Sequence, residues 1–145
     1  MSFREKSSWV VFLALLLVYG GYYLKSGFSP PLLGAEGEKA VFAVSQFGLV
    51  IGLVVIMIIG HIVAAISSPK TADDPEDERE KLISLRSDSW GGHVTGFGVL
   101  LAISTVYFTD ATAISVAYWA LLALVAGELV SHGARILAYR GVVNA

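Results

Sequence analysis

Four long apolar runs divide this chain, and they limit its possible folds more than any other feature of the sequence. They cover residues 9–25, 40–67, 89–108 and 113–138, and few charged side chains interrupt them. A helix that crosses the ~30 Å hydrocarbon core of a bilayer needs about 20 apolar residues, because each residue adds ~1.5 Å. The pattern therefore predicts an all-α fold. We expect one integral membrane domain, residues 1–145, in which four transmembrane helices form an antiparallel, up-down bundle.

The composition agrees with this fold and excludes several classes of function. Of the 145 residues, 55% are hydrophobic and 15% are charged, whereas a soluble domain has about 25% charged residues. The net charge of −2 provides no basic excess for a nucleic-acid partner. Because the chain has no cysteine, disulfides, cysteine-ligated zinc and iron–sulfur clusters are excluded.

Residues 69–88, here named the charged segment, separate the second apolar run from the third. A charge at the bilayer centre costs about 3 kcal/mol or more, so this segment must lie in water. Asp73 or Asp74 is suited to cap a helix that starts at Pro75. We expect that helix to continue into the third apolar run, so that the third transmembrane helix extends into the cytoplasm.

The charged segment also carries the residues that best suit a docking surface for a protein or for lipid headgroups. These residues are Glu78, Arg79, Lys81 and Arg86. The alternative is a solvated helix start that is held by Glu–Lys and Glu–Arg pairs and has no partner.

Lysine and arginine side chains indicate the orientation in the membrane. Eight of the ten lie on the side of the charged segment and the two termini, namely Arg4, Lys6, Lys70, Arg79, Lys81, Arg86, Arg135 and Arg140. Lys25 and Lys39 lie on the other side. Since cytoplasmic loops are enriched in these residues, both termini and the charged segment are predicted to be cytoplasmic.

Two pairs of glycines have the spacing that lets helices approach closely. Gly48 and Gly52 belong to the second run, and Gly92 and Gly96 belong to the third. Such pairs pack either against another helix of the same chain or across the seam of a homo-oligomer.

Ionisable residues inside the apolar runs are the candidates for chemistry. His61, His93 and His132 all lie toward the cytoplasmic ends of their helices, and Glu128 precedes His132 by one helical turn. Imidazole and carboxylate groups on facing helices are typical ligands of a metal ion or haem. Two alternatives remain open. In the first, these groups hydrogen-bond or pair with one another near the membrane interface. In the second, Glu128 is the proton-binding residue of a small proton-coupled transporter.

The sequence contains no phosphate loop, no G-x-S-x-G and no nucleophile–base arrangement, so we expect a protein that is not an enzyme. Gly60–Ile66 reads G-H-I-V-A-A-I, and Asp77–Asp88 reads D-E-R-E-K-L-I-S-L-R-S-D. In these residues the chain resembles small uncharacterised bacterial four-helix membrane proteins, which have an acidic D-E-R-x-x-x-I segment before the third helix. The resemblance implies four helices in a bacterial inner membrane and no catalytic residue. The expected function is that of an accessory, regulatory or assembly subunit with protein partners, with a homo-oligomer as the other possibility.

Overall fold

The computed structural model describes residues 1–30, 36–69, 75 and 77–141, and all regular structure in these residues is helical. The elements are α1 (Phe3–Leu15), the π-helical turn η1 (Leu16–Gly20), α2 (Gly21–Lys25), α3 (Glu36–Ile66), α5 (Glu78–Phe108) and α6 (Ala113–Tyr139). The first three elements follow one another without a break and form one span.

In the described part of the chain, four helices are long and apolar enough to cross a membrane, as predicted. They cover Phe3–Lys25, Lys39–Ile66, Glu78–Phe108 and Ala113–Tyr139. Each overlaps one of the four apolar runs, and the predicted all-α class with four candidate spans is confirmed.

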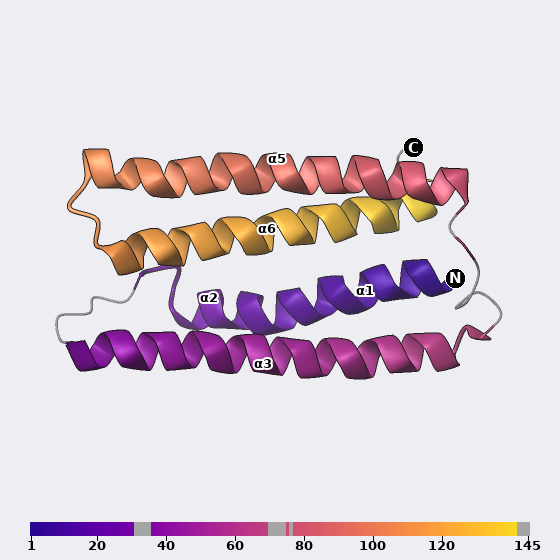
Figure 1. The fold of residues 1–145 in the computed structure, drawn as a ribbon, viewed down its shortest axis with the longest axis horizontal. Coiled ribbons are helices and arrows are strands. Elements are labelled where there is room, and N and C mark those ends of the chain that lie inside the picture. The colour runs from indigo at the N-terminus through magenta and orange to yellow at the C-terminus, as the bar shows by residue number, and fades with distance from the viewer. Residues whose placement is uncertain (31–35, 70–74, 76, 142–145) are drawn as a thin grey trace.

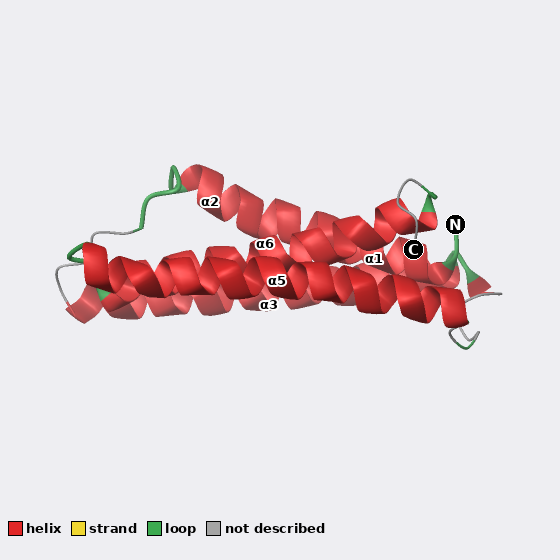
Figure 2. Ribbon diagram, turned by 90° about the horizontal axis from the view of Figure 1, so that it is seen from above, coloured by secondary structure: helices red, strands yellow, loops and turns green. Residues whose placement is uncertain are grey.

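The helices lie side by side and alternate in direction along the chain (Figure 1). The N-terminus, the start of α5 and the ends of α3 and α6 gather at one end of the molecule (Figure 1). This end is named the charged end below. In the perpendicular view, α1 and α2 run obliquely to α3 and α5 (Figure 2).

The most extensive contact between two helices joins α5 to α6. Small residues line it, and they are Gly91, Thr95, Gly98, Ala123, Gly127 and Ser131. A Cβ atom added to Gly91 would lie 2.7 Å from the carbonyl oxygen of Gly127, and one added to Gly98 would lie 2.6 Å from Cβ of Ala123. The backbones are therefore so close that nothing larger fits, as is typical of helix pairs in membranes.

Among the described residues, the four glycines of the two predicted pairs make no close contact with another helix of this chain. A Cβ atom on Gly48, Gly52, Gly92 or Gly96 would meet no atom within 4 Å. On α5 the seam passes through the neighbouring residue Gly91, which lies about 100° around the helix from Gly92. On α3 the close approach is at Gly60, where a Cβ atom would overlap the side chain of Val10.

The start of α5 also differs from the prediction. Asp77 caps the helix by accepting a hydrogen bond from the backbone nitrogen of Glu80 at 2.6 Å. Pro75 lies outside the helix, and the predicted caps Asp73 and Asp74 lie outside the described residues. The predicted continuation is confirmed, since α5 runs without a break from the charged segment into the apolar run.

Tyrosines form much of the core at the end opposite the charged end. Tyr118 is fully buried, and Tyr23 is 1% exposed. The Tyr23 hydroxyl donates to the backbone oxygen of Tyr118 at 3.0 Å, and the two rings pack edge to face with centroids 4.9 Å apart. This contact joins α2 to the first turns of α6.

Candidate functional site

The first turns of α1 contact each of the other three long helices through polar groups. Arg4 pairs with Glu80 of α5 at 2.9 Å, and Glu5 lies 3.7 Å from Arg140 at the end of α6. The Lys6 ammonium donates to the backbone oxygen of Ser67, just after α3, at 3.0 Å. Consecutive residues of one helical turn point in different directions, so this turn joins the three neighbouring helices at the charged end.

His61 completes the link between α1 and α3. Its Nδ1 bonds to the backbone oxygen of Met57 at 2.7 Å, and its Nε2 bonds to the Ser7 hydroxyl at 2.9 Å. A carbonyl oxygen can only accept, so Nδ1 carries a proton and donates to Met57, and in the neutral form of the ring Nε2 accepts from the Ser7 hydroxyl. Both ring nitrogens therefore have partners within the protein.

Asp88 joins α5 to α6 at the same end. Its carboxylate accepts hydrogen bonds from the Ser131 hydroxyl at 2.7 Å and from the Arg135 guanidinium at 2.5 Å. We name the whole set of interhelical contacts the polar end cluster. It comprises Arg4, Glu5, Lys6, Ser7, His61, Ser67, Glu80, Asp88, Ser131, Arg135 and Arg140.

A cavity of about 130 Å³ lies within the polar end cluster, between α1, α5 and α6. Its lining is mostly polar and consists of Phe3, Arg4, Ser7, Ser8, Ser84, Arg135 and Tyr139. No acidic side chain belongs to this lining among the described residues. The sequence did not predict that Arg4 and Arg135 would line one cavity. It gives the position of each residue along its helix, but it does not give the side of the helix that faces a neighbouring helix.

The three histidines are not gathered into one ligand set. His93 is on the exposed outer side of α5, where its Nδ1 donates to the backbone oxygen of Ser89 at 2.6 Å. His132 contacts Glu128 at 3.7 Å, and the Glu128 side chain is 63% exposed. Within the described part of the chain, no group of three or more histidine, aspartate or glutamate side chains could hold a metal ion. The three histidines share the charged end, but His61 faces α1 while His93 faces outward.

The predicted docking residues occupy one side of the first turns of α5. Glu78, Arg79, Lys81, Leu82, Leu85 and Arg86 are all exposed, and they are named the outer face of α5. Glu78 and Lys81 pair at 2.9 Å, as predicted for a solvated helix start. Ile83 and Ser87 point the other way and are buried. The side chains of Leu82 and Leu85 are thus left on the charged outer face, 51% and 68% exposed.

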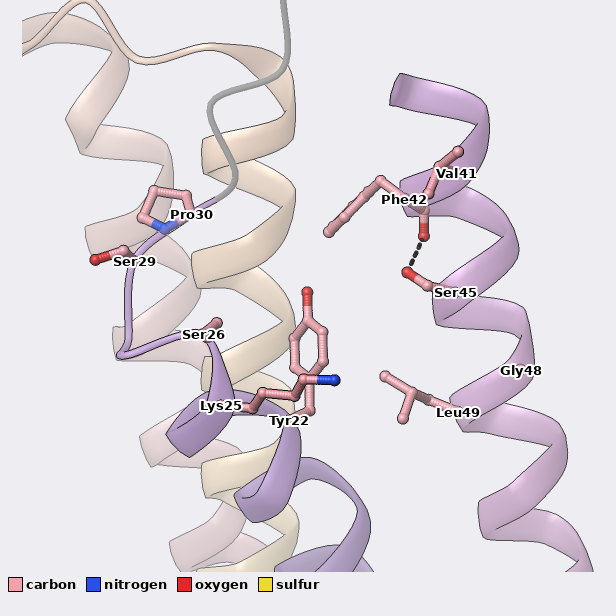
Figure 3. A pocket seen from close by; sticks show the side chains of 10 residues that line it. All are labelled: Tyr22, Lys25, Ser26, Ser29, Pro30, Val41, Phe42, Ser45, Gly48 and Leu49. Carbon is pink, nitrogen blue, oxygen red and sulfur yellow. Dashed lines mark hydrogen bonds between the residues drawn. The ribbon is translucent and has the colours of Figure 1, made fainter. Parts of the chain in front are cut away.

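A larger, mainly apolar pocket opens between α2 and α3, at the end opposite the polar end cluster (Figure 3). Its volume is about 1000 Å³. Tyr22 and Lys25 contribute from α2, and Phe42, Ser45 and Leu49 contribute from α3 (Figure 3). The Ser45 hydroxyl donates to the backbone oxygen of Phe42 at 2.7 Å, so it is not free to bind a ligand as a donor.

Over the ranges that the structure describes, these features indicate an all-helical membrane protein with four candidate spans and a polar cluster that joins the spans at one end. No protein-family model, no curated protein and no solved structure matches this chain significantly. The resemblance to small bacterial four-helix membrane proteins therefore stays a prediction.

Proposed function

We propose that this chain is a non-enzymatic integral membrane protein of a bacterial cytoplasmic membrane that acts through a protein partner. Its role is that of an accessory, regulatory or assembly subunit. Both termini and the outer face of α5 are cytoplasmic in this proposal, because eight of the ten lysines and arginines lie at that end.

The outer face of α5 is the observation that carries the proposal. Arg4 pairs with Glu80, and Ile83 is buried against the bundle, so the inner side of these turns is already held by the chain itself. Leu82 and Leu85 lie on the opposite side and remain exposed among charges of both signs. An apolar stripe with a charged rim on a fixed helix suits a groove on another protein, in which leucines supply contact area and charges set the register.

The absence of cysteine allows an experiment with single engineered thiols. We expect Leu85→Cys to react with a membrane-impermeant maleimide only after the cells are permeabilised. Asp110→Cys, in the turn between α5 and α6, is expected to react in intact cells once the outer envelope is opened. The opposite pattern would refute the proposed orientation.

A photoactivatable crosslinker attached to the same Leu85→Cys thiol then tests the partner. We expect one discrete adduct with another protein, and none from Leu100→Cys, which is similarly exposed but lies on the apolar part of α5. Equal adducts from both positions would reflect collision in the membrane and would contradict a docking face. Adducts that contain only this chain would replace the partner protein by a homo-oligomer.

A further inference from the structure

The pocket between α2 and α3 opens where the first span leaves its neighbour. The π-helical turn η1 ends at Gly20, and α2 then diverges from α3 (Figure 2). Such a turn is a common cause of a bend in a helix. On the other wall, a Cβ atom added to Gly48 of α3 would meet no atom within 4 Å. The divergence of one helix and a missing side chain on the other therefore leave this space open.

The walls of the pocket are mainly apolar. Rings and aliphatic chains form most of them, from Tyr22, Pro30, Val41, Phe42 and Leu49. Two serines of the lining use their hydroxyl hydrogens within the chain, because Ser26 donates to the backbone oxygen of Tyr23 and Ser45 donates to that of Phe42. The hydroxyl of Ser29 points away from α3 (Figure 3). The space therefore suits hydrocarbon.

Lys25 supplies the charge of this pocket. Its side chain is exposed and extends from α2 toward α3 (Figure 3). No hydrogen bond or ion pair joins the Lys25 ammonium to another described residue, and no acidic side chain belongs to the described lining. A cation beside an apolar space is complementary to a molecule with an anionic head and a hydrocarbon tail.

The depth of the pocket matches one leaflet of a bilayer. Lys25 is the last residue of the first span, and the second span begins at Lys39. The pocket starts close to that level, at Val41, and reaches Leu49, eight residues further along α3. Eight residues at ~1.5 Å each span ~12 Å. Half of the ~30 Å hydrocarbon core is ~15 Å, so an acyl chain of one leaflet has about the length of this pocket.

We propose that this pocket binds an anionic phospholipid, with one acyl chain between α2 and α3 and the headgroup phosphate beside Lys25. A chain in the pocket gains little over a chain in bulk lipid, because both surroundings are apolar. The charge of Lys25 therefore sets the preference for an anionic headgroup. This site does not rest on the partner protein proposed above, because it lies at the opposite end of the molecule from the outer face of α5. Its failure would leave the crosslinking expected at Leu85→Cys unchanged.

The test uses the purified full chain in nanodiscs with equal amounts of anionic phosphatidylglycerol and zwitterionic phosphatidylcholine. The protein is released into a neutral detergent, and native mass spectrometry identifies the lipids that stay bound. We expect one retained phospholipid per chain. Phosphatidylglycerol should be enriched about fivefold, the gain in affinity that one lysine gives beside an anionic headgroup.

Two lysines at the same end of the molecule form a matched pair for charge. Lys25→Gln removes the ammonium that lines the pocket, and Lys39→Gln removes one that does not; both side chains are exposed. We expect Lys25→Gln to lose the fivefold preference for phosphatidylglycerol and Lys39→Gln to keep it.

Two glycines of α3 form a matched pair for volume. Gly48→Leu places a side chain at the pocket wall. Gly52→Leu adds the same side chain one turn further along, outside the lining, where a Cβ atom also meets no atom within 4 Å. We expect Gly48→Leu to retain at least about fivefold less phospholipid than Gly52→Leu. If Gly48→Leu does not fold by far-UV circular dichroism, the two lysine variants decide the question, because their side chains are exposed.

Any of three results would overturn the proposal. The first is a wild-type protein that retains no phospholipid, or retains the two lipids in the ratio of the nanodisc. The second is an equal loss of preference in Lys25→Gln and Lys39→Gln, since the preference would then come from surface charge in general. The third is equal retention of lipid by folded Gly48→Leu and Gly52→Leu, which would place the bound lipid elsewhere.

Discussion

Replacement of Gly91 by alanine adds a single methyl group at a point where α5 and α6 almost touch. That methyl would lie 2.7 Å from the carbonyl oxygen of Gly127 and 2.8 Å from Cβ of Ser131. Contacts under 3.0 Å essentially never occur for Cβ atoms, so the two helices would have to move apart. Because neither neighbour is the end of a flexible side chain, a rotamer change cannot relieve the overlap.

The expected cost follows from two opposing effects. Overpacking of a tight contact destabilises by about 1–3 kcal/mol. Alanine in place of a helical glycine stabilises by roughly 0.5–1 kcal/mol. The Gly92→Ala variant carries the same methyl on the next residue, where no atom lies within 4 Å. Both variants gain the helix propensity, so the difference between them isolates the overpacking, and we expect it to be ~1–3 kcal/mol.

Reversible unfolding in mixed micelles of a mild detergent and sodium dodecyl sulfate, followed by far-UV circular dichroism, gives the two free energies of unfolding. Variants that agree within about 0.5 kcal/mol would refute the seam, since that is the usual effect of an exposed substitution. A greater loss in Gly92→Ala than in Gly91→Ala would place the seam on the face that the G-x-x-x-G spacing suggested.

Two further substitutions test the opposite end of the bundle and the one acidic residue in the apolar part of α6. Tyr23→Phe removes the hydrogen bond to the backbone oxygen of Tyr118 and should lower the free energy of unfolding by about 0.5–1.5 kcal/mol in the same assay. Tyr107 is 80% exposed, so the control variant Tyr107→Phe should leave the free energy of unfolding unchanged. Glu128→Gln should change the free energy of unfolding by less than about 0.5 kcal/mol, because the Glu128 side chain is largely exposed and its contact with His132 is 3.7 Å long. A larger loss would show that the carboxylate supports the packing of α6.

The spans could be predicted from the sequence because length and hydrophobicity alone define them. The inward faces could not, since a helix in lipid is apolar on every side and its periodicity does not separate inside from outside. On α3, for example, Ile51, Val55, Ile58 and Ile62 are all large, apolar and exposed. Glycine spacing was equally ambiguous on α5, where Gly91 and Gly92 are adjacent and only the first contacts α6.

The polar end cluster shows the same limit. The depth of His61, His93 and His132 could be counted along the helices, and all three do lie toward the charged end. Their directions depend on how each helix is rotated, so the sequence could not show that His61 would meet Ser7 while His93 would face outward. The role of α1 was missed for a related reason. Its short polar start resembles a simple membrane flank until the helix is docked among the others.

The attachment of α3 explains why a polar cluster is useful at this end. Its main contacts are with α1 and η1, and most of its surface is exposed. Apolar side chains are as well solvated by lipid as by a neighbouring helix, so hydrophobicity alone does not hold α3 in place. The hydrogen bonds from Lys6 and Ser7 therefore give α3 a defined position on α1.

The same turn of α1 also contacts α5 close to its outer face. Arg4 pairs with Glu80, which precedes Lys81 of the outer face by one residue. Ser84 and Leu85 are adjacent on α5, one lining the cavity and the other exposed outside. The contacts that hold α5 in the bundle and its outer face therefore belong to the same turns of one helix.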